Sequence, residues 1–97
     1  MPTYIGLVNF KESGKTGNAE LDVGKAARAL IETHGGRILS IYWTEDDPDM
    51  MVAFEGRDKD QATKVFRDLA SQQDVNVRMV RALTEGEKER AVQGLQV

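Results

Sequence analysis

Four side chains of this sequence are the best candidates for contacting a small ligand: Asn9, Tyr42, Trp43 and Asp49. Asn9 alternates with Ile5 and Leu7, so we expect it to point with them toward the helices, as a polar group in a mostly apolar cavity. Trp43 ends another apolar segment and can share that cavity. The alternative is structural: Trp43 belongs to the core, and backbone groups at the strand end satisfy Asn9.

A second pattern with chemical potential is Ser13-Gly14-Lys15-Thr16, which has the Gly-Lys-Thr end of a phosphate-binding P-loop and follows an apolar segment. The P-loop also needs a glycine five residues before Gly14, where this sequence has Asn9. We therefore interpret the segment as a surface turn.

The remaining polar residues do not favour a metal site. The single histidine, His34, stands at the end of a predicted helix, where it can interact with the carbonyl end of the helix dipole. Without cysteine, one histidine forms a zinc site only if several carboxylates join it. The acidic link Glu45–Asp49 lacks the ligand spacing of a calcium loop and is interpreted as a solvated hairpin, in which Asp49 can cap turn amides or line a pocket. We expect no metal and no cofactor.

The apolar pattern predicts the elements that must position these residues. Strands are expected over Tyr4–Phe10, Arg37–Thr44, Met50–Glu55 and Val75–Leu83, and helices over Ala19–Thr33 and Asp58–Ala70. Thr84 followed by Glu87 is a capping-box pattern, which predicts a short terminal helix. The order β-α-β-β-α-β indicates a ferredoxin-like α+β fold, with two helices on one face of a four-stranded antiparallel sheet. A chain of 97 residues encloses only one core, so residues 1–97 are expected to form a single domain.

Alternation along the strands defines two sets of positions, and both sets are apolar. The set assigned to the helix-packed core is Ile5, Leu7, Leu39, Ile41, Trp43, Met50, Val52, Phe54, Val75, Val77 and Met79. The opposite set is Tyr4, Val8, Phe10, Ile38, Ser40, Tyr42, Met51, Ala53, Val80 and Ala82, with Glu55, Asn76 and Arg78 as polar members. A second sheet face with so many apolar residues predicts that it is buried against another copy of the same sheet, in a homodimer or a higher homo-oligomer.

Composition limits the other partners. A net charge of −3 offers no positive field for nucleic acid, and the strand Met50–Phe54 lacks the basic and stacking residues of an RNA-recognition motif. No apolar run approaches the ~20 residues of a membrane span, and no signal peptide is recognisable. With no cysteine, these features predict a cytoplasmic protein that binds neither nucleic acid nor membranes.

Several segments resemble the GYD domain family of small bacterial proteins: Pro2-Thr3-Tyr4, the Gly35-Gly36 step into an aromatic strand, Tyr42-Trp43-Thr44 before the acidic hairpin, and Arg81-Ala82-Leu83-Thr84. The family's Gly-Glu-Tyr-Asp stretch falls on Asp46-Asp47-Pro48-Asp49, where the last aspartate and the acidic character are retained. The resemblance covers nearly the whole chain.

This resemblance implies a dimeric α+β barrel, in which two sheets pack face to face. Such barrels include cofactor-independent monooxygenases and haem-degrading enzymes whose pockets are shaped by asparagine and tryptophan. Haem is disfavoured here because the helix Asp58–Ala70 has no histidine to bind iron. The hypotheses are therefore a barrel that binds a small apolar ligand between sheet and helices, a cofactor-independent monooxygenase or isomerase, and a structural homo-oligomerisation module. Whether the protein is an enzyme is left open.

Overall fold

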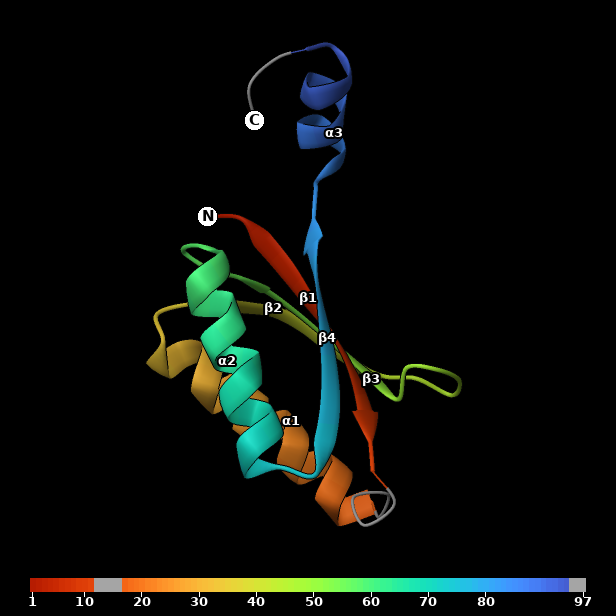
Figure 1. Cartoon of the computed structure of the whole chain (residues 1–97). Coiled ribbons are helices and arrows are strands. Elements are labelled where there is room, and N and C mark those ends of the chain that lie inside the picture. The colour runs from red at the N-terminus through yellow and green to blue at the C-terminus, as the bar shows by residue number, and fades with distance from the viewer. Residues whose placement is uncertain (12–16, 95–97) are drawn as a thin grey trace.

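The computed structural model describes residues 1–11 and 17–94 of the chain (Figure 1). Its elements are β1 (Thr3–Phe10), α1 (Gly17–Thr33), β2 (Arg37–Trp43), β3 (Met50–Glu55), α2 (Lys59–Gln72), β4 (Val75–Ala82) and α3 (Glu85–Val92). Each predicted helix and strand is present, with bounds that differ by at most a few residues. The P-loop-like segment Ser13–Thr16 lies outside the described residues.

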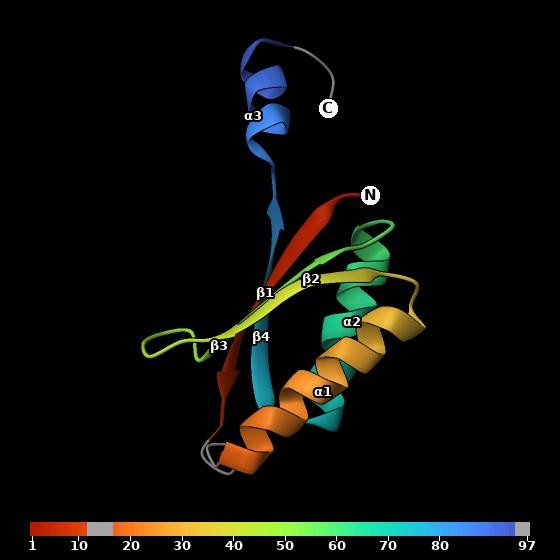
Figure 2. The same ribbon diagram turned by 180° about the vertical axis from the view of Figure 1, so that it is seen from behind.

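The four strands form one antiparallel sheet in the order β2-β3-β1-β4. Helices α1 and α2 connect β1 to β2 and β3 to β4, and both lie on the same side of the sheet (Figures 1 and 2). The predicted ferredoxin-like α+β fold is confirmed. The other side of the sheet, which we call the open face, is covered by none of the described helices (Figure 2).

The core lies between the sheet and the two helices. Its strand members are Tyr4, Val8, Phe10, Met50, Val52, Phe54 and Val75, and its helix members are Val23, Ala27, Ile31, Ala62, Val65, Phe66 and Leu69. Phe54 is at its centre, with its ring 5.9 Å from that of Tyr4 and 5.4 Å, edge-on, from that of Phe66.

The predicted phase of β1 is wrong. Tyr4, Val8 and Phe10 face the helices and are buried, whereas Ile5 and Leu7 lie on the open face and are only partly buried. The prediction failed because Gly6, a core-facing position of β1, has no side chain. A Cβ atom there would lie 2.3 Å from Cε1 of Phe66, so the aromatic ring occupies the space of the missing side chain.

The predicted faces of β2 also need correction, because a β-bulge shifts its register against β3 between Ile38 and Ser40. Ile38 pairs with Phe54, so it lies on the core side and not on the open face. Leu39, which was assigned to the core, is 45% exposed.

The open face therefore has a different membership from the predicted one. From the strand register, it consists of Thr3, Ile5, Leu7, Asn9, Arg37, Ser40, Tyr42, Met51, Ala53, Glu55, Asn76, Arg78, Val80 and Ala82. Ile5 and Leu7 take the place of Tyr4, Val8, Phe10 and Ile38, and seven of the fourteen members are polar, so this face is less apolar than expected. Its polar members Glu55, Asn76 and Arg78 were placed correctly.

The ends of the helices follow the sequence signals. Gly35 ends α1 with a φ of +82°, a conformation that glycine adopts without strain. The side chain of Asp58 caps α2 by accepting a 2.8 Å hydrogen bond from the backbone N–H of Gln61. Thr84 and Glu87 form the predicted capping box of α3.

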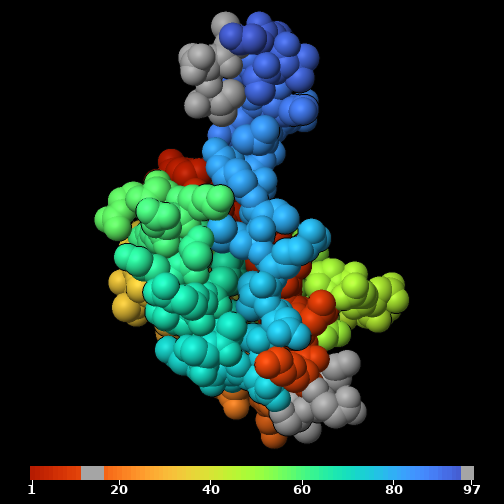
Figure 3. Space-filling model, in the orientation of Figure 1, coloured from red at the N-terminus to blue at the C-terminus, as the bar shows by residue number. Residues whose placement is uncertain are grey.

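Helix α3 is isolated from the core. It has no buried residue and stands away from the rest of the molecule, beyond the end of β4 (Figures 1 and 3). Its side-chain link to the sheet is the ion pair between Arg81 and Glu87, whose Nη2 and Oε2 atoms are 3.5 Å apart. Within the described part of the chain, no helix has the length and apolar character needed to cross a membrane.

Candidate functional site

Asn9 and Asp49 join the end of β1 to the start of β3 through a reciprocal pair of hydrogen bonds. The backbone N–H of Asp49 donates to Oδ1 of Asn9 at 3.1 Å, and the backbone N–H of Phe10 donates to Oδ2 of Asp49 at 2.8 Å. The ladder between β1 and β3 ends at the pair Val8 and Met50, so these side chains extend the pairing beyond it. Asp49 thus caps the amide of a strand end, where the amides of the turn were expected, and Asn9 is satisfied near a strand end.

The hairpin between β2 and β3 holds its own shape. The backbone N–H of Thr44 donates to the carbonyl of Asp49 at 2.9 Å, and the Thr44 hydroxyl donates to the carbonyls of Asp46, at 3.0 Å, and of Pro48. The acidic link is a hairpin, as expected, and it projects from the open side of the sheet (Figure 3). These bonds fix the positions from which Asp47 and Pro48 extend.

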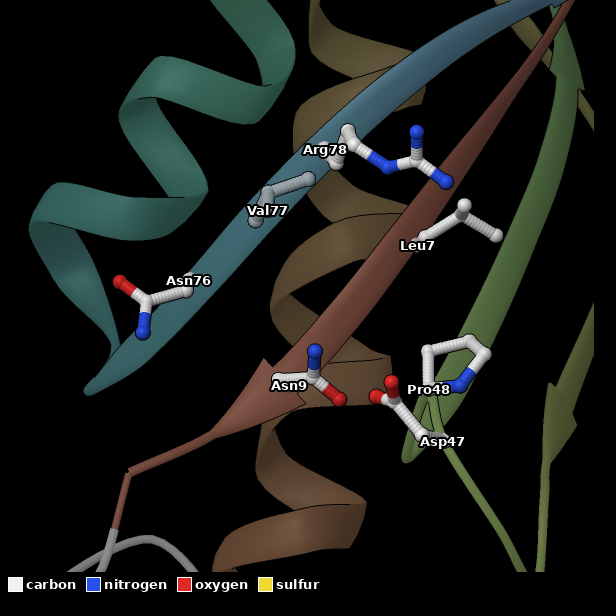
Figure 4. Close-up of a pocket in the computed structure, with 7 residues that line it drawn as sticks. All are labelled: Leu7, Asn9, Asp47, Pro48, Asn76, Val77 and Arg78. Carbon is white, nitrogen blue, oxygen red and sulfur yellow. The ribbon is translucent and has the colours of Figure 1, made fainter.

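A hollow of about 310 Å³ lies on the open face where this hairpin meets β1 and β4 (Figure 4). It is lined by Leu7, Asn9, Asp47, Pro48, Asn76, Val77 and Arg78. Asn9 is on the side of the sheet away from the helices, because it pairs with Asn76 while its neighbours Val8 and Phe10 are buried in the core. The prediction that Asn9 points into a cavity between sheet and helices is wrong, and its cause is the wrong phase of β1.

Tyr42 and Trp43 lie on opposite faces of β2. Tyr42 pairs with Met51 on the open face and is 61% exposed. Trp43 lies on the helix side, where its ring leaves so little room at Gly24 of α1 that a Cβ atom there would be 2.8 Å from Cζ2 of Trp43. Trp43 is 43% exposed and lines a groove of about 270 Å³ between α1 and β2, with Leu21, Gly24, Lys25, Arg28 and Ile41.

The four candidate residues therefore do not converge on one site. Asn9 and Asp49 are in contact, Tyr42 is on the same face but two strands away, and Trp43 is on the other face. A monooxygenase-like pocket was expected to need Asn9 and Trp43 in a shared cavity, and that arrangement is absent.

A sequence model of the GYD domain matches residues 4–92, which run from β1 to the last residue of α3. The chain belongs to the GYD domain family. The solution structure of the C-terminal domain of the MgtC protein from Mycobacterium tuberculosis is similar in fold, with a TM-score of 0.58 and 13% sequence identity over 84% of this chain and 86% of the other. A search of curated proteins finds no match.

Within this GYD domain, Asp49 occupies the last position of the Gly-Glu-Tyr-Asp stretch and has a structural contact that explains an aspartate there. Its carboxylate accepts the N–H of Phe10, which the short side chain of Asp49 reaches from the position directly before β3. The other three positions, Asp46, Asp47 and Pro48, belong to the projecting hairpin.

Sequence reasoning missed two residues of the hollow, Asp47 and Arg78. Arg78 was recognised only as a polar member of the second sheet face, and Asp47 only as part of an acidic link. Their juxtaposition depends on the fold, because β4 lies beside β1 while the hairpin connects β2 and β3. An arginine on the same face of its strand as Val80 and Ala82 was the available signal.

His34 links the two helices of the GYD domain. Its Nε2 atom lies 3.4 Å from Oδ2 of Asp68 in α2, and both side chains are partly exposed. Its backbone N–H also donates to the carbonyl of Leu30 at 3.0 Å, as expected for a residue at the end of α1. Among the residues that the structure describes, no three histidine, aspartate or glutamate side chains come together as a metal site would require.

Proposed function

We propose that this GYD domain functions as a homodimer, formed by packing the open faces of two sheets against each other. The observation that carries this proposal is an apolar patch in two neighbouring rows of the open face. One row is Tyr42, Met51 and Leu7 and ends at Arg78, and the next is Ser40, Ala53, Ile5 and Val80. None of the described helices lies over them.

The composition of this face supports self-association. Its centre on β3 and β1, Met51, Leu7, Ala53 and Ile5, is apolar. Arg78 ends one of these rows on the edge strand β4, and Arg37 and Glu55 lie in the next row. Burying apolar surface stabilises an interface by about 25 cal/mol per Å² before the costs of association are subtracted. A two-fold axis would bring the same patch of both copies together, so one surface serves both sides of the interface.

The oligomeric state in solution tests this proposal. We expect light scattering coupled to gel filtration to give the mass of a dimer at micromolar concentration. Met51→Glu places a charge at the centre of the face. In a dimer this carboxylate would be buried with no opposite charge beside it, so the variant should be a monomer. Leu21→Glu is the matched control, because Leu21 is 54% exposed on α1 and outside the open face, so this variant should stay dimeric. A wild-type monomer under these conditions contradicts the proposal.

A second candidate function is the binding of a small, largely apolar ligand between α1 and the sheet. The groove around Trp43 favours it, because Leu21, Ile41 and the indole ring supply apolar walls beside the backbone of Gly24. Trp43 is the single tryptophan, so its indole N–H gives one resolved NMR signal. Titration with indole or naphthalene should shift that signal saturably in the wild type and not in Gly24→Leu, which fills the groove. An unshifted signal with both probes would exclude this groove as their binding site.

A further inference from the structure

The hollow at the hairpin contains two opposite charges that no other described residue pairs with. The ion pairs of the described residues are Lys11–Asp74, His34–Asp68, Arg37–Glu55, Arg57–Asp58 and Arg81–Glu87. Arg78 and Asp47 both line the hollow, and neither takes part in these pairs or pairs with the other. The hollow therefore has a cationic wall on β4 and an anionic wall on the hairpin, with space between them.

Asn9 adds a positioned hydrogen-bond donor to the same space. Its Oδ1 atom is occupied by the N–H of Asp49, which fixes the orientation of the amide and leaves the Nδ2 hydrogens without a partner in the described structure. Figure 4 shows the nitrogen of Asn9 turned toward the side of Leu7 and Arg78, and its oxygen turned toward the hairpin. Arg78 and Asn9 can therefore donate to one acceptor group.

Apolar surface separates the charged walls. Leu7 and the ring of Pro48 lie between the guanidinium of Arg78 and the carboxylate of Asp47 (Figure 4). A volume of about 310 Å³ suits a ligand of modest size. The complementary molecule has a carboxylate at one end, a cationic nitrogen at the other and a small apolar part between or beside them.

We propose that this hollow is a binding site for a free amino acid or a closely similar small zwitterion. Its carboxylate pairs with the guanidinium of Arg78, a bidentate arrangement for which arginine is well suited, and accepts a further bond from Nδ2 of Asn9. Its ammonium faces Asp47, and an apolar side chain contacts Leu7 and Pro48. Because both charged walls are exposed in the single protomer, we expect weak binding, with dissociation constants nearer millimolar than nanomolar.

All residues of the site belong to one protomer, but Leu7 and Arg78 also lie on the open face that the proposed dimer would bury, so the amino acid and the partner protomer compete for this part of the face. The test is an NMR titration of the full chain, as the wild type and as Met51→Glu, whose open face stays uncovered, with the standard L-amino acids, one at a time at millimolar concentration. At least one apolar amino acid should shift the amide signals of Leu7, Asn9, Asp47 and Arg78 saturably. Its N-acetyl derivative, which has lost the ammonium, and its amide, which has lost the carboxylate, should each bind about tenfold more weakly.

Variants that each remove one charge distinguish the contributions of the two walls to binding. Arg78→Gln should weaken binding of the free amino acid and of its N-acetyl derivative, whereas Asp47→Asn should weaken only ligands that keep the ammonium. Arg37→Gln and Asp46→Asn are the matched controls, because Arg37 is on the open face two rows away and Asp46 is in the same hairpin. Both controls should bind as the wild type does.

Two results would overturn the proposal: no amino acid shifts these four signals, or the N-acetyl derivative binds as tightly as the free amino acid. Light scattering on the wild type tests the dimer separately. A wild-type monomer that binds amino acids refutes only the dimer, and a Met51→Glu monomer that binds none refutes only this site.

Discussion

The Oδ1 atom of Asn9 accepts the backbone N–H of Asp49, 40 residues away in sequence, at 3.1 Å. The Asp49 carboxylate in turn accepts the N–H of Phe10. Two short side chains thus extend the contact between β1 and β3 past the last pair of the ladder, at the place where the hairpin leaves the sheet.

Removing the Asp49 carboxylate should destabilise the fold. In Asp49→Ala the partly buried N–H of Phe10 has no acceptor, and leaving such a group unsatisfied costs about 1–3 kcal/mol. Urea denaturation should show that decrease in the free energy of unfolding. Asp46→Ala is the control, because the hydrogen bond of Asp46 uses its backbone carbonyl, which the substitution keeps. An equal decrease in the free energy of unfolding of this control would mean that the charge of the hairpin matters and not the hydrogen bond to Phe10.

A methyl group at Gly6 should be poorly tolerated. Gly6→Ala places a Cβ atom 2.3 Å from Cε1 of Phe66, and overpacking of this kind costs about 1–3 kcal/mol. The free energy of unfolding of the double variant Gly6→Ala/Phe66→Leu should exceed the value expected if the two single effects simply added, because the smaller side chain frees the space. Strict additivity would argue against a direct clash.

Alanine at Gly35 should also destabilise the protein, for a conformational reason. Its φ of +82° costs a residue with a Cβ atom about 1–2 kcal/mol. Thermal unfolding should show a lower melting temperature for Gly35→Ala. Gly17→Ala should leave it unchanged or higher, because no atom lies within 4 Å of the added Cβ and φ there is not positive.

The helical content of α3 should depend on pH. The N–H of Thr84 donates to the carboxylate of Glu87 at 2.9 Å, and this backbone hydrogen bond is the main cause that lowers the pKa of Glu87 below its ordinary value of 4.5. A carboxyl whose pKa is lowered by folding stabilises the folded form above its unfolded pKa and loses that effect as the pH falls through its folded pKa.

NMR chemical shifts of Glu85–Val92 should therefore become less helical as the pH is lowered from about 4.5, while the core signals stay unchanged. In Glu87→Gln the capping amide does not titrate, so its α3 signals should be nearly independent of pH over the same range. Equal pH dependence in both proteins would assign the effect to other carboxylates.

Much of the fold was predictable because the apolar positions of the two helices and of β3 repeat with clear periods. The phase of β1 was not, because the core position at Gly6 has no side chain and Ile5 and Leu7 look like core residues. The bulge beside Leu39 hid the faces of β2 in the same way, since alternation assumes an unbroken register.

The candidate site was less accessible from sequence than the fold. The role of Asp49 in capping a backbone amide was among those expected, but its partner Phe10 was not, because the two are brought together only by the pairing of β1 with β3. The error in Asn9 followed directly from the phase of β1. Asp47 and Arg78 come from a hairpin and a strand that are not consecutive, so no local pattern connects them.

The bulge in β2 has a consequence for unwanted association. β2 is an edge strand with several large apolar residues, and such edges are templates for strands of other molecules to add to the sheet. The irregular register between Ile38 and Ser40 interrupts the row of backbone donors and acceptors that an added strand would need. At the β2 edge the molecule is therefore a poor template for fibril growth, although its sheet has an uncovered face.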